Sequence, residues 1–244
     1  MSRKLHLRTR KLHRYLGLFI GIQFLFWTVG GLYFSWNNMK DVHGKTLIDK
    51  SEKTFAFQYN EPVRKLLGIV NDPIEKIEAI VVNKDSLLRL HTSKGSKLLK
   101  LNKNHYSTQK EITKEEVTAF VKSRLKEEIA IKEITFLTEK DISKGHEYRG
   151  KPLPAYAVHL DHPTNTKVYV HPQLAKITTV RNDNWRRFDF LWMLHVMDFE
   201  TRDHITNWTL RIFSVLGLLT IFSGFYLYYL SSPTIRNLKR KIRR

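Results

Sequence analysis

The chain has 244 residues, with 42 Lys and Arg against 23 Asp and Glu, and a formal net charge of +19 at neutral pH. It contains no cysteine, which excludes disulfides, thiolate zinc sites and iron–sulfur clusters. Twelve of the basic residues lie at the two ends, and no basic stripe with interleaved aromatics occurs between them, so the charge does not indicate nucleic-acid binding.

The first apolar run extends from Tyr15 to Trp36 and contains no charged residue. At a rise of ~1.5 Å per residue, a helix of this length crosses the ~30 Å hydrocarbon core of a bilayer. The run ends in bulky residues rather than at a small-residue cleavage site, so it is not typical of a cleaved signal peptide. We expect a basic tail over residues 1–14 and a transmembrane helix over residues 15–36.

The pattern after the first span predicts a helix followed by strands. Val63, Leu66, Leu67 and Val70 have helical spacing behind Asn60, and predict a short amphipathic helix over residues 61–70. Three strands are expected next, at Ile77 to Val82, Leu87 to His91 and Lys97 to Leu101.

The same order then repeats. Thr113 and Glu116 form a capping box before a helix whose apolar face is Val117, Phe120, Val121 and Leu125. The strands expected after it are Ile134 to Leu137, Ala155 to Asp161, Lys167 to His171 and Ala175 to Val180. This predicts an α+β fold of two similar units, residues 37–112 and 113–182, each an antiparallel sheet with one face covered by one helix. Leu88 and Leu90 would then face the helix, and Arg89 and His91 would not.

The C-terminal part predicts a second membrane segment. Residues 183–207 form an amphipathic stretch expected to be an interfacial helix, in which Asp198 and Arg202 have the i, i+4 spacing of an ion pair. Residues 208–230 contain one charge, Arg211, close enough to the helix end to reach the headgroups, and predict a second transmembrane helix. Residues 231–244 form a second basic tail. By the positive-inside rule both tails are cytoplasmic and the central domain is extracytoplasmic.

Small residues in the two spans predict close helix packing. Gly17 and Gly21 form a Gly-x-x-x-Gly pair, while Gly217 and Gly224 lie seven residues apart near Ser223. The two spans are expected to pack together or against a partner, and Gly17 with Gly21 could support a homodimer.

Three stretches resemble the PepSY-associated transmembrane helix family: KLHRYLGLFIG (11–21), RFDFLWMLHVMDFETRD (187–203) and GLLTIFSGFYLYY (217–229). The duplicated helix-plus-sheet unit, with its turn VHPQLAKIT (170–178), is similar to the PepSY domain. The resemblance implies a bacterial inner-membrane protein with an extracytoplasmic binding or regulatory domain. Such a protein would act in iron or siderophore uptake or in the regulation of an envelope peptidase, with a peptide, peptidase, transporter or reductase as its partner.

Some larger relatives of this kind resemble haem-bearing reductases, which makes a haem b subunit of a ferric or siderophore reductase the alternative. His13, His195, His43 and His204 are the candidate axial ligands. His13 and His195 belong to opposite sides of the membrane, so a haem would need His13 with its copy in a dimer, or His195 with His43 or His204. As a binding protein the chain needs no cofactor, and these histidines would simply be interfacial.

No pattern predicts catalysis or a metal site. The sequence contains no H-E-x-x-H, no G-x-S-x-G and no phosphate-binding glycine loop, so binding is favoured over enzymatic activity and no catalytic residue is proposed. His159, His162 and His171 fall on one expected hairpin, and we expect them to be solvent-exposed rather than to bind a metal.

Overall fold

The computed structural model describes residues 3–56, 68, 70, 72–102, 105–109 and 111–235. The chain forms two compact units. Met1–Trp36 and Phe188–Arg244 make a helical unit, and Asn37–Arg187 make a sheet unit. Helix α5 (Asp183–Val196) begins in the sheet unit and ends in the helical unit.

The helical unit contains α1 (Arg3–Trp36) and α6 (Trp208–Ser231). Leu5–Trp36 and Trp208–Ser231 are long and apolar enough to cross a membrane. Both expose large apolar side chains, for example Leu18 at 71% and Phe222 at 64%. Water would penalise such surfaces strongly, whereas lipid does not. The chain therefore has the character of a membrane protein with a central soluble domain.

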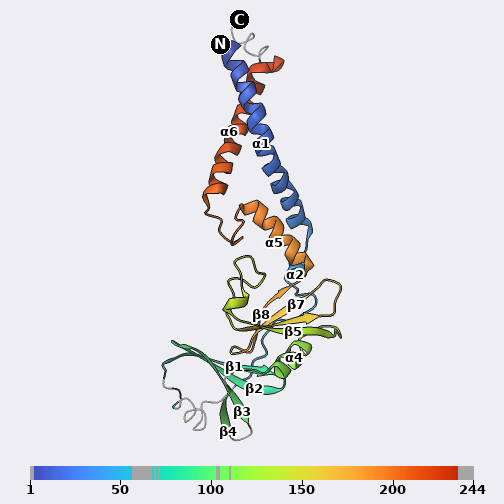
Figure 1. Cartoon of the computed structure of the whole chain (residues 1–244), viewed down its shortest axis with the longest axis vertical. Coiled ribbons are helices and arrows are strands. Elements are labelled where there is room, and N and C mark those ends of the chain that lie inside the picture. Colours follow the sequence, from blue (N-terminus) through green and yellow to red (C-terminus); the bar gives the residue numbers. More distant parts are fainter. Residues whose placement is uncertain are drawn as a thin grey trace. The chain divides into compact units, whose positions relative to one another are not determined.

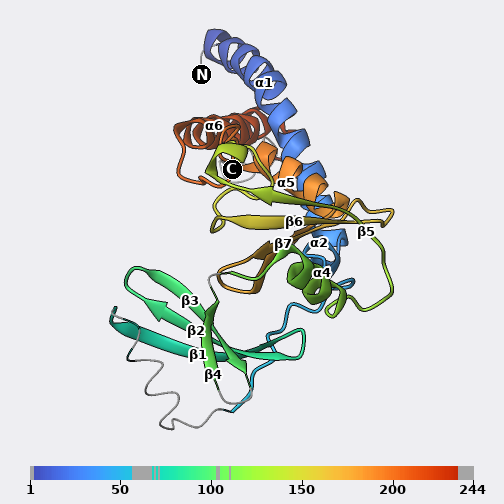
Figure 2. The same cartoon turned by 60° about the horizontal axis from the view of Figure 1, so that its bottom comes forward.

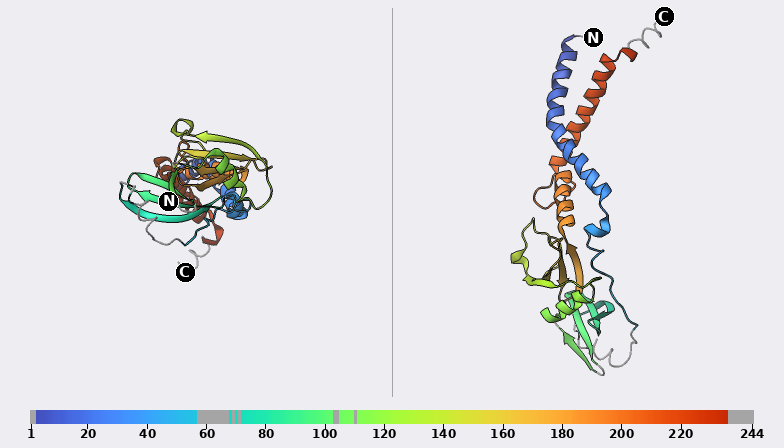
Figure 3. Two further views of the ribbon diagram at one scale, coloured as in Figure 1. Left: turned by 90° about the horizontal axis from the view of Figure 1, so that it is seen from below. Right: turned by 90° about the vertical axis from the view of Figure 1, so that its right-hand side faces the viewer.

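Helices α1 and α6 pack against each other (Figure 3). Phe19 and Phe213 meet with ring centroids 5.3 Å apart. A Cβ on Gly217 would lie 3.3 Å from the Phe24 ring, so this glycine permits the close approach. No described atom lies within 4 Å of a Cβ added to Gly17 or Gly21, so that pair is not part of the α1–α6 contact.

The sheet unit holds two antiparallel four-stranded sheets, each in sequential strand order (Figure 1). The first contains β1 (Ile74–Val82), β2 (Asp85–Thr92), β3 (Gly95–Asn102) and β4 (His105–Gln109). Three of these were predicted, but β4 was not, because its sequence HYSTQ has no apolar alternation. Asn83 and Lys84, with φ of 52° and 73°, turn β1 into β2.

The second sheet follows α4 (Lys114–Lys122) and contains β5 (Ile131–Leu137), β6 (Ala155–Leu160), β7 (Lys167–His171) and β8 (Lys176–Arg181). All four strands were predicted to within three residues at each end. The capping box of Thr113 and Glu116 is formed. The helix predicted over residues 61–70 lies outside the described residues except for Gly68 and Val70. Short helices also occur at α2 (Met39–Val42) and as a 3₁₀ turn at Glu139–Asp141.

One hydrophobic core joins both sheets to α4, which lies close to both in Figure 2. Helix α4 contributes Val117, Phe120 and Val121 to this core. The first sheet contributes Ile80, Val82, Leu87 and Leu98, and the second contributes Val158, Leu160, Val168 and Val170. Helix α4 therefore packs against both sheets, whereas the sequence predicted that it covers only the second.

Both sheets are also covered on their opposite faces. Ala79, Leu88, Leu90 and Leu99 form a second cluster on the first sheet, packed against Phe55. Leu137, Ala155 and Tyr169 form a third on the second sheet, covered by Tyr148 from the segment before β6. The prediction that Leu88 and Leu90 face the helix was wrong, because the core shared with α4 takes Leu87 from β2 and leaves Leu88 and Leu90 in the cluster on the opposite face. Arg89 lies on the same face as Leu87 and is 1% exposed, so it is not on an uncovered face.

Replacing Phe120 by Ala should destabilise both sheets together. Phe120 is 4% exposed, and truncating a buried phenylalanine costs roughly 3–5 kcal/mol through lost burial and a residual cavity. Denaturant unfolding of the purified protein in detergent, followed by near-ultraviolet circular dichroism, measures the loss. Lys122→Ala on the same helix is the matched exposed control, and equal midpoints for the two variants would contradict a shared core.

Candidate functional site

An extended segment, Leu47 to Ala56, crosses the sheet unit beside β1 and the end of α4, and we call it the strap. It pairs with β1 through the Thr54–Ile80 bridge, where the Phe55 amide donates to the Ala79 carbonyl at 3.4 Å. Near its start it forms the Ile48–Leu125 bridge. The strap thus adds a short strand to the β1 edge of the first sheet.

A buried arginine lies where the strap meets both sheets. The Arg89 guanidinium donates to Glu52 of the strap at 3.0 Å and to Glu78 of β1 at 2.7 Å. Its Nε donates to the carbonyl of Leu174, in the turn between β7 and β8, at 2.7 Å. One planar fork of donors therefore connects strap, first sheet and second sheet.

The carboxylates of this cluster are held in their charged form. Hydrogen bonds from Lys76, and then from His91 and Arg89, outweigh burial and lower the pKa of Glu78 to about 2. For Glu52, burial alone would raise the pKa, but the hydrogen bond and charge of Arg89 outweigh it and the pKa is lowered. The cluster is an ion-paired support rather than a proton donor for chemistry at neutral pH.

Three cavities lie along the strap. The α4 cavity, of about 410 Å³, is lined by Val81, Ala119, Asn83, Lys53, Lys84, Ser123 and Arg124. The acidic cavity, of about 400 Å³, includes Glu52 and Glu78. The lysine cavity, of about 440 Å³, includes Lys40, Lys45, Lys50 and Lys126. Volumes of this size fit a few side chains of a peptide or a small molecule.

The side chain of Asn83 lines the α4 cavity and includes a buried acceptor that has no partner among the described residues. Asn83 donates its amide to the Glu116 carbonyl at 2.6 Å, but its Oδ1 is buried and has no partner in the described part of the chain. A buried acceptor without a hydrogen bond costs folding free energy. A ligand whose N–H or O–H group reached this oxygen would therefore gain binding free energy. Lys53 and Lys84 add positive charge, and Val81 with Ala119 adds an apolar surface.

The structure places two of the predicted haem ligands, His13 and His195, apart from each other within the helical unit. His13 Nδ1 is 2.7 Å from the Ser223 hydroxyl, and a Cβ on Gly224 would lie 3.2 Å from the His13 ring. His13 thus joins α1 to α6. His195 instead contacts Trp27 of α1, fourteen residues or ~21 Å along the helix from His13. One haem iron cannot be held by both histidines of one chain.

His195 lies in an aromatic cluster. Its ring stacks on Trp192 with centroids 6.0 Å apart and also contacts Phe34 and Trp27 at 6.0 and 6.1 Å. Burial lowers its pKa, and its Nδ1 is buried with no hydrogen-bond partner among the described residues. It is therefore a neutral imidazole held by rings, which is compatible with packing and also with ligation through one nitrogen.

The end of α5 is capped by side chains of α1. Gln23 Nε2 donates to the Leu194 carbonyl at 2.9 Å, and Trp27 Nε1 donates to the His195 carbonyl at 2.8 Å. The last carbonyls of a helix have no partner within it, and in an apolar environment each needs one. The arrangement explains why a polar residue, Gln23, lies buried inside the first predicted span.

The other candidate histidines serve local turns. His43 Nδ1 is 2.8 Å from the Met39 carbonyl, and His204 Nδ1 is 3.3 Å from the Thr201 hydroxyl. In the β6–β7 hairpin, His159 pairs with Lys167, whereas His171 lies at the other end of β7 and is buried. The prediction of an exposed hairpin was thus wrong for His171. No cluster of three potential metal ligands occurs among the described residues.

The predicted pair between Asp198 and Arg202 is not formed. Helix α5 ends at Val196, so residues 197–207 are not helical, and the two positions do not share a helix face. Arg202 instead donates to Asp189 at 2.7 Å. Asp198 accepts the amides of the following turn, including His204 N at 3.0 Å.

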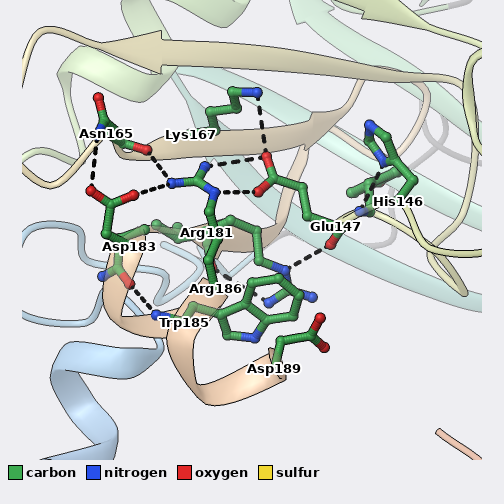
Figure 4. Close-up of polar contacts among 12 residues, drawn as sticks. His146, Glu147, Asn165, Lys167, Arg181, Asp183, Trp185, Arg186 and Asp189 are labelled. Carbon is green, nitrogen blue, oxygen red and sulfur yellow. Dashed lines mark hydrogen bonds and ion pairs between the residues drawn. The ribbon is translucent and has the colours of Figure 1, made fainter. Parts of the chain in front are cut away.

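A second ion-pair cluster, around Glu147, was also missed (Figure 4). Arg186, on the first turn of α5, donates to the Glu147 carboxylate at 2.8 Å and to Asp183 at 2.8 Å. Tyr169 of β7 donates to Glu147 at 2.6 Å. Burial alone would raise the pKa of Glu147, but these hydrogen bonds lower it. The cluster attaches the start of α5 to the second sheet, and every carboxylate in it is engaged.

The chain matches no protein-family model, no curated protein and no solved structure. The resemblance to the PepSY-associated family therefore stays a prediction from the sequence.

Replacing Arg89 by Met should separate the strap from the sheets. The substitution keeps side-chain volume but leaves Glu52 and Glu78 without their main partner, at a cost of about 2 kcal/mol after allowing for their partial exposure. Limited proteolysis should cut faster within residues 47–56. Lys132→Met, an exposed change on β5, serves as the control, and unchanged cleavage in the Arg89 variant would count against the cluster as the strap's support.

Proposed function

We propose that the chain is a membrane-anchored binding or accessory protein of the bacterial inner membrane. Both termini would be cytoplasmic, and the sheet unit would lie on the outer side of the membrane. The partner would be a peptide segment of an envelope peptidase, or of a transporter or reductase for iron or siderophores. This assignment of partner class rests on the PepSY resemblance of residues 11–21 and 187–203.

The main support for a binding role is Asn83, which lines the α4 cavity and whose buried Oδ1 has no hydrogen-bond partner among the described residues. A peptide supplies both backbone N–H donors and apolar side chains, which matches an acceptor beside Val81 and Ala119. The strap already pairs with β1 in an extended conformation through the Thr54–Ile80 bridge. An extended peptide is therefore the kind of partner that this region of the sheet unit suits. Lys53 and Lys84 favour a partner with acidic residues nearby.

The topology predicts opposite results for two reporters. Alkaline phosphatase fused after Gln109 should be active because it lies outside the cytoplasm, and green fluorescent protein fused to the C-terminus should fluoresce because it lies inside. An inactive phosphatase fusion with a stable full-length product would contradict an extracytoplasmic sheet unit.

Partner binding should depend on the α4 cavity. A photo-crosslinking residue at Lys84 should capture one specific envelope protein in cells, and the same residue at Lys132 on β5 should not. Asn83→Gly, which tolerates the positive φ of this turn but removes the acceptor, should reduce the Lys84 crosslink about tenfold, in keeping with one lost buried hydrogen bond. Identification of the captured protein by mass spectrometry tests the partner class, and equal capture at both positions would contradict the site.

A haem b subunit is the second candidate, favoured by one observation: the buried, unpartnered Nδ1 of His195. Since His13 and His195 lie apart along α1, a haem on His195 needs its second ligand from His43, His204, a second copy or another subunit. Protein purified in mild detergent would then show a Soret band that His195→Ala abolishes. A colourless protein from haem-replete cells removes this candidate.

A further inference from the structure

The lysine cavity has more positive than negative side chains in its lining. Four lysines line its volume of about 440 Å³, and Asp49 is the one carboxylate in the lining. The Asp49 carboxylate accepts the amide and hydroxyl of Ser51 at 2.9 and 2.8 Å. The cavity therefore presents a net positive surface for an anion.

Backbone contacts hold two of these ammonium groups in place. Lys126 Nζ donates to the Lys45 carbonyl at 2.6 Å, and the Lys126 amide donates to the Leu47 carbonyl at 3.0 Å. Lys50 Nζ donates to the His43 carbonyl at 2.9 Å. Neutral carbonyls orient both groups, and each ammonium keeps further donors for a ligand.

Of the four lysines, Lys50 has the environment least favourable to its charged form. It is half-buried, and burial together with Arg181, Lys45 and Lys151 lowers its pKa to about 8. A bound anion would offset both the burial and the repulsion, so this position gains most from one.

The position of the cavity along the chain indicates the source of the anion. Lys40 follows Trp36, the last residue of α1, by four residues, which span at most ~14 Å. Trp36 is 80% exposed and has the character of an interfacial anchor. The headgroup region adjoins the end of a membrane-spanning helix, so acidic headgroups are within reach of Lys40, which lines this cavity.

We propose that Lys40, Lys45, Lys50 and Lys126 form a binding site for the phosphate group of an acidic phospholipid in the leaflet from which α1 emerges. The phosphate oxygens accept hydrogen bonds from the ammonium groups of Lys50 and Lys126, and Lys40 and Lys45 supply further positive charge. The site is separate from the α4 cavity and does not depend on the partner proposed above.

The test uses the full chain in lipid nanodiscs and the reactivity of Lys50 towards an amine-acylating reagent at pH 8, read by peptide mass spectrometry. The discs contain phosphatidylcholine alone, or phosphatidylcholine with phosphatidylglycerol. A bound acidic headgroup that raises the Lys50 pKa by one unit lowers its neutral fraction from about a half to about a tenth, so acylation should slow about fivefold. Lys132 on β5 is the internal control, and its rate should not change.

Added inorganic phosphate in pure phosphatidylcholine discs separates a lipid from a soluble anion. The lipid site predicts weak protection from phosphate and strong protection from phosphatidylglycerol. Equal protection by phosphate overturns the lipid assignment, and an unchanged Lys50 rate in all discs overturns the anion site.

Variants then link the protection to the cavity. Lys45→Gln combined with Lys126→Gln should abolish the difference between the two disc types, whereas Lys132→Gln should preserve it. Because Lys126 also bonds the backbone, the exposed Lys40→Gln provides a second variant and should weaken the protection without changing the fold. Full protection in both cavity variants overturns the proposal.

Discussion

The sheet unit depends on one helix that is buried from two directions. Helix α4 places Val117, Phe120 and Val121 between sheets that form separate hydrogen-bonded networks. Neither sheet could bury this face of its strands without the helix and the opposite sheet. The position of each sheet relative to the other, and hence of the strap between them, follows from this packing.

At the edge of the shared core lies a buried charge that needs polar partners. Arg89 lies on the core-facing side of β2, where the strap, β1 and the β7–β8 turn converge. A charge at such a place is tolerated because carboxylates and a carbonyl surround it, and the same contacts hold the strap on the β1 edge. The cavities along the strap are a result of this arrangement, since the strap bridges the sheet and α4 without filling the space beside them.

The helical unit is subject to a different constraint. The last backbone carbonyls of α5 lie in an apolar environment and need hydrogen-bond donors from outside the helix. Gln23 and Trp27 satisfy the end of α5, and Asn207 adds a bond to the Val196 carbonyl at 2.8 Å. These contacts place the His195 ring among aromatic side chains. The polar residues of this unit are thus explained first by hydrogen-bond satisfaction, and a cofactor role for His195 would be additional to it.

The elements whose cause is local could be predicted from the amino-acid pattern. Hydrophobic length located both long helices, although α1 begins at Arg3, twelve residues before the predicted span. The capping box located the start of α4, and apolar runs located seven of the eight strands in the described part of the chain. Strand β4 was not predicted because its pairing with β3, rather than an apolar pattern of its own, selects its conformation. Only the packing of separate elements determines that α4 contacts both sheets, that Arg89 is buried and Glu147 partly buried in ion-pair clusters, and that His13 contacts α6 while His195 contacts α1. An arginine among the leucines of β2 was a signal of a buried charge, but its partners lie up to 85 residues away along the chain. Such distant contacts have no periodicity to reveal them, because they arise only when separate elements pack.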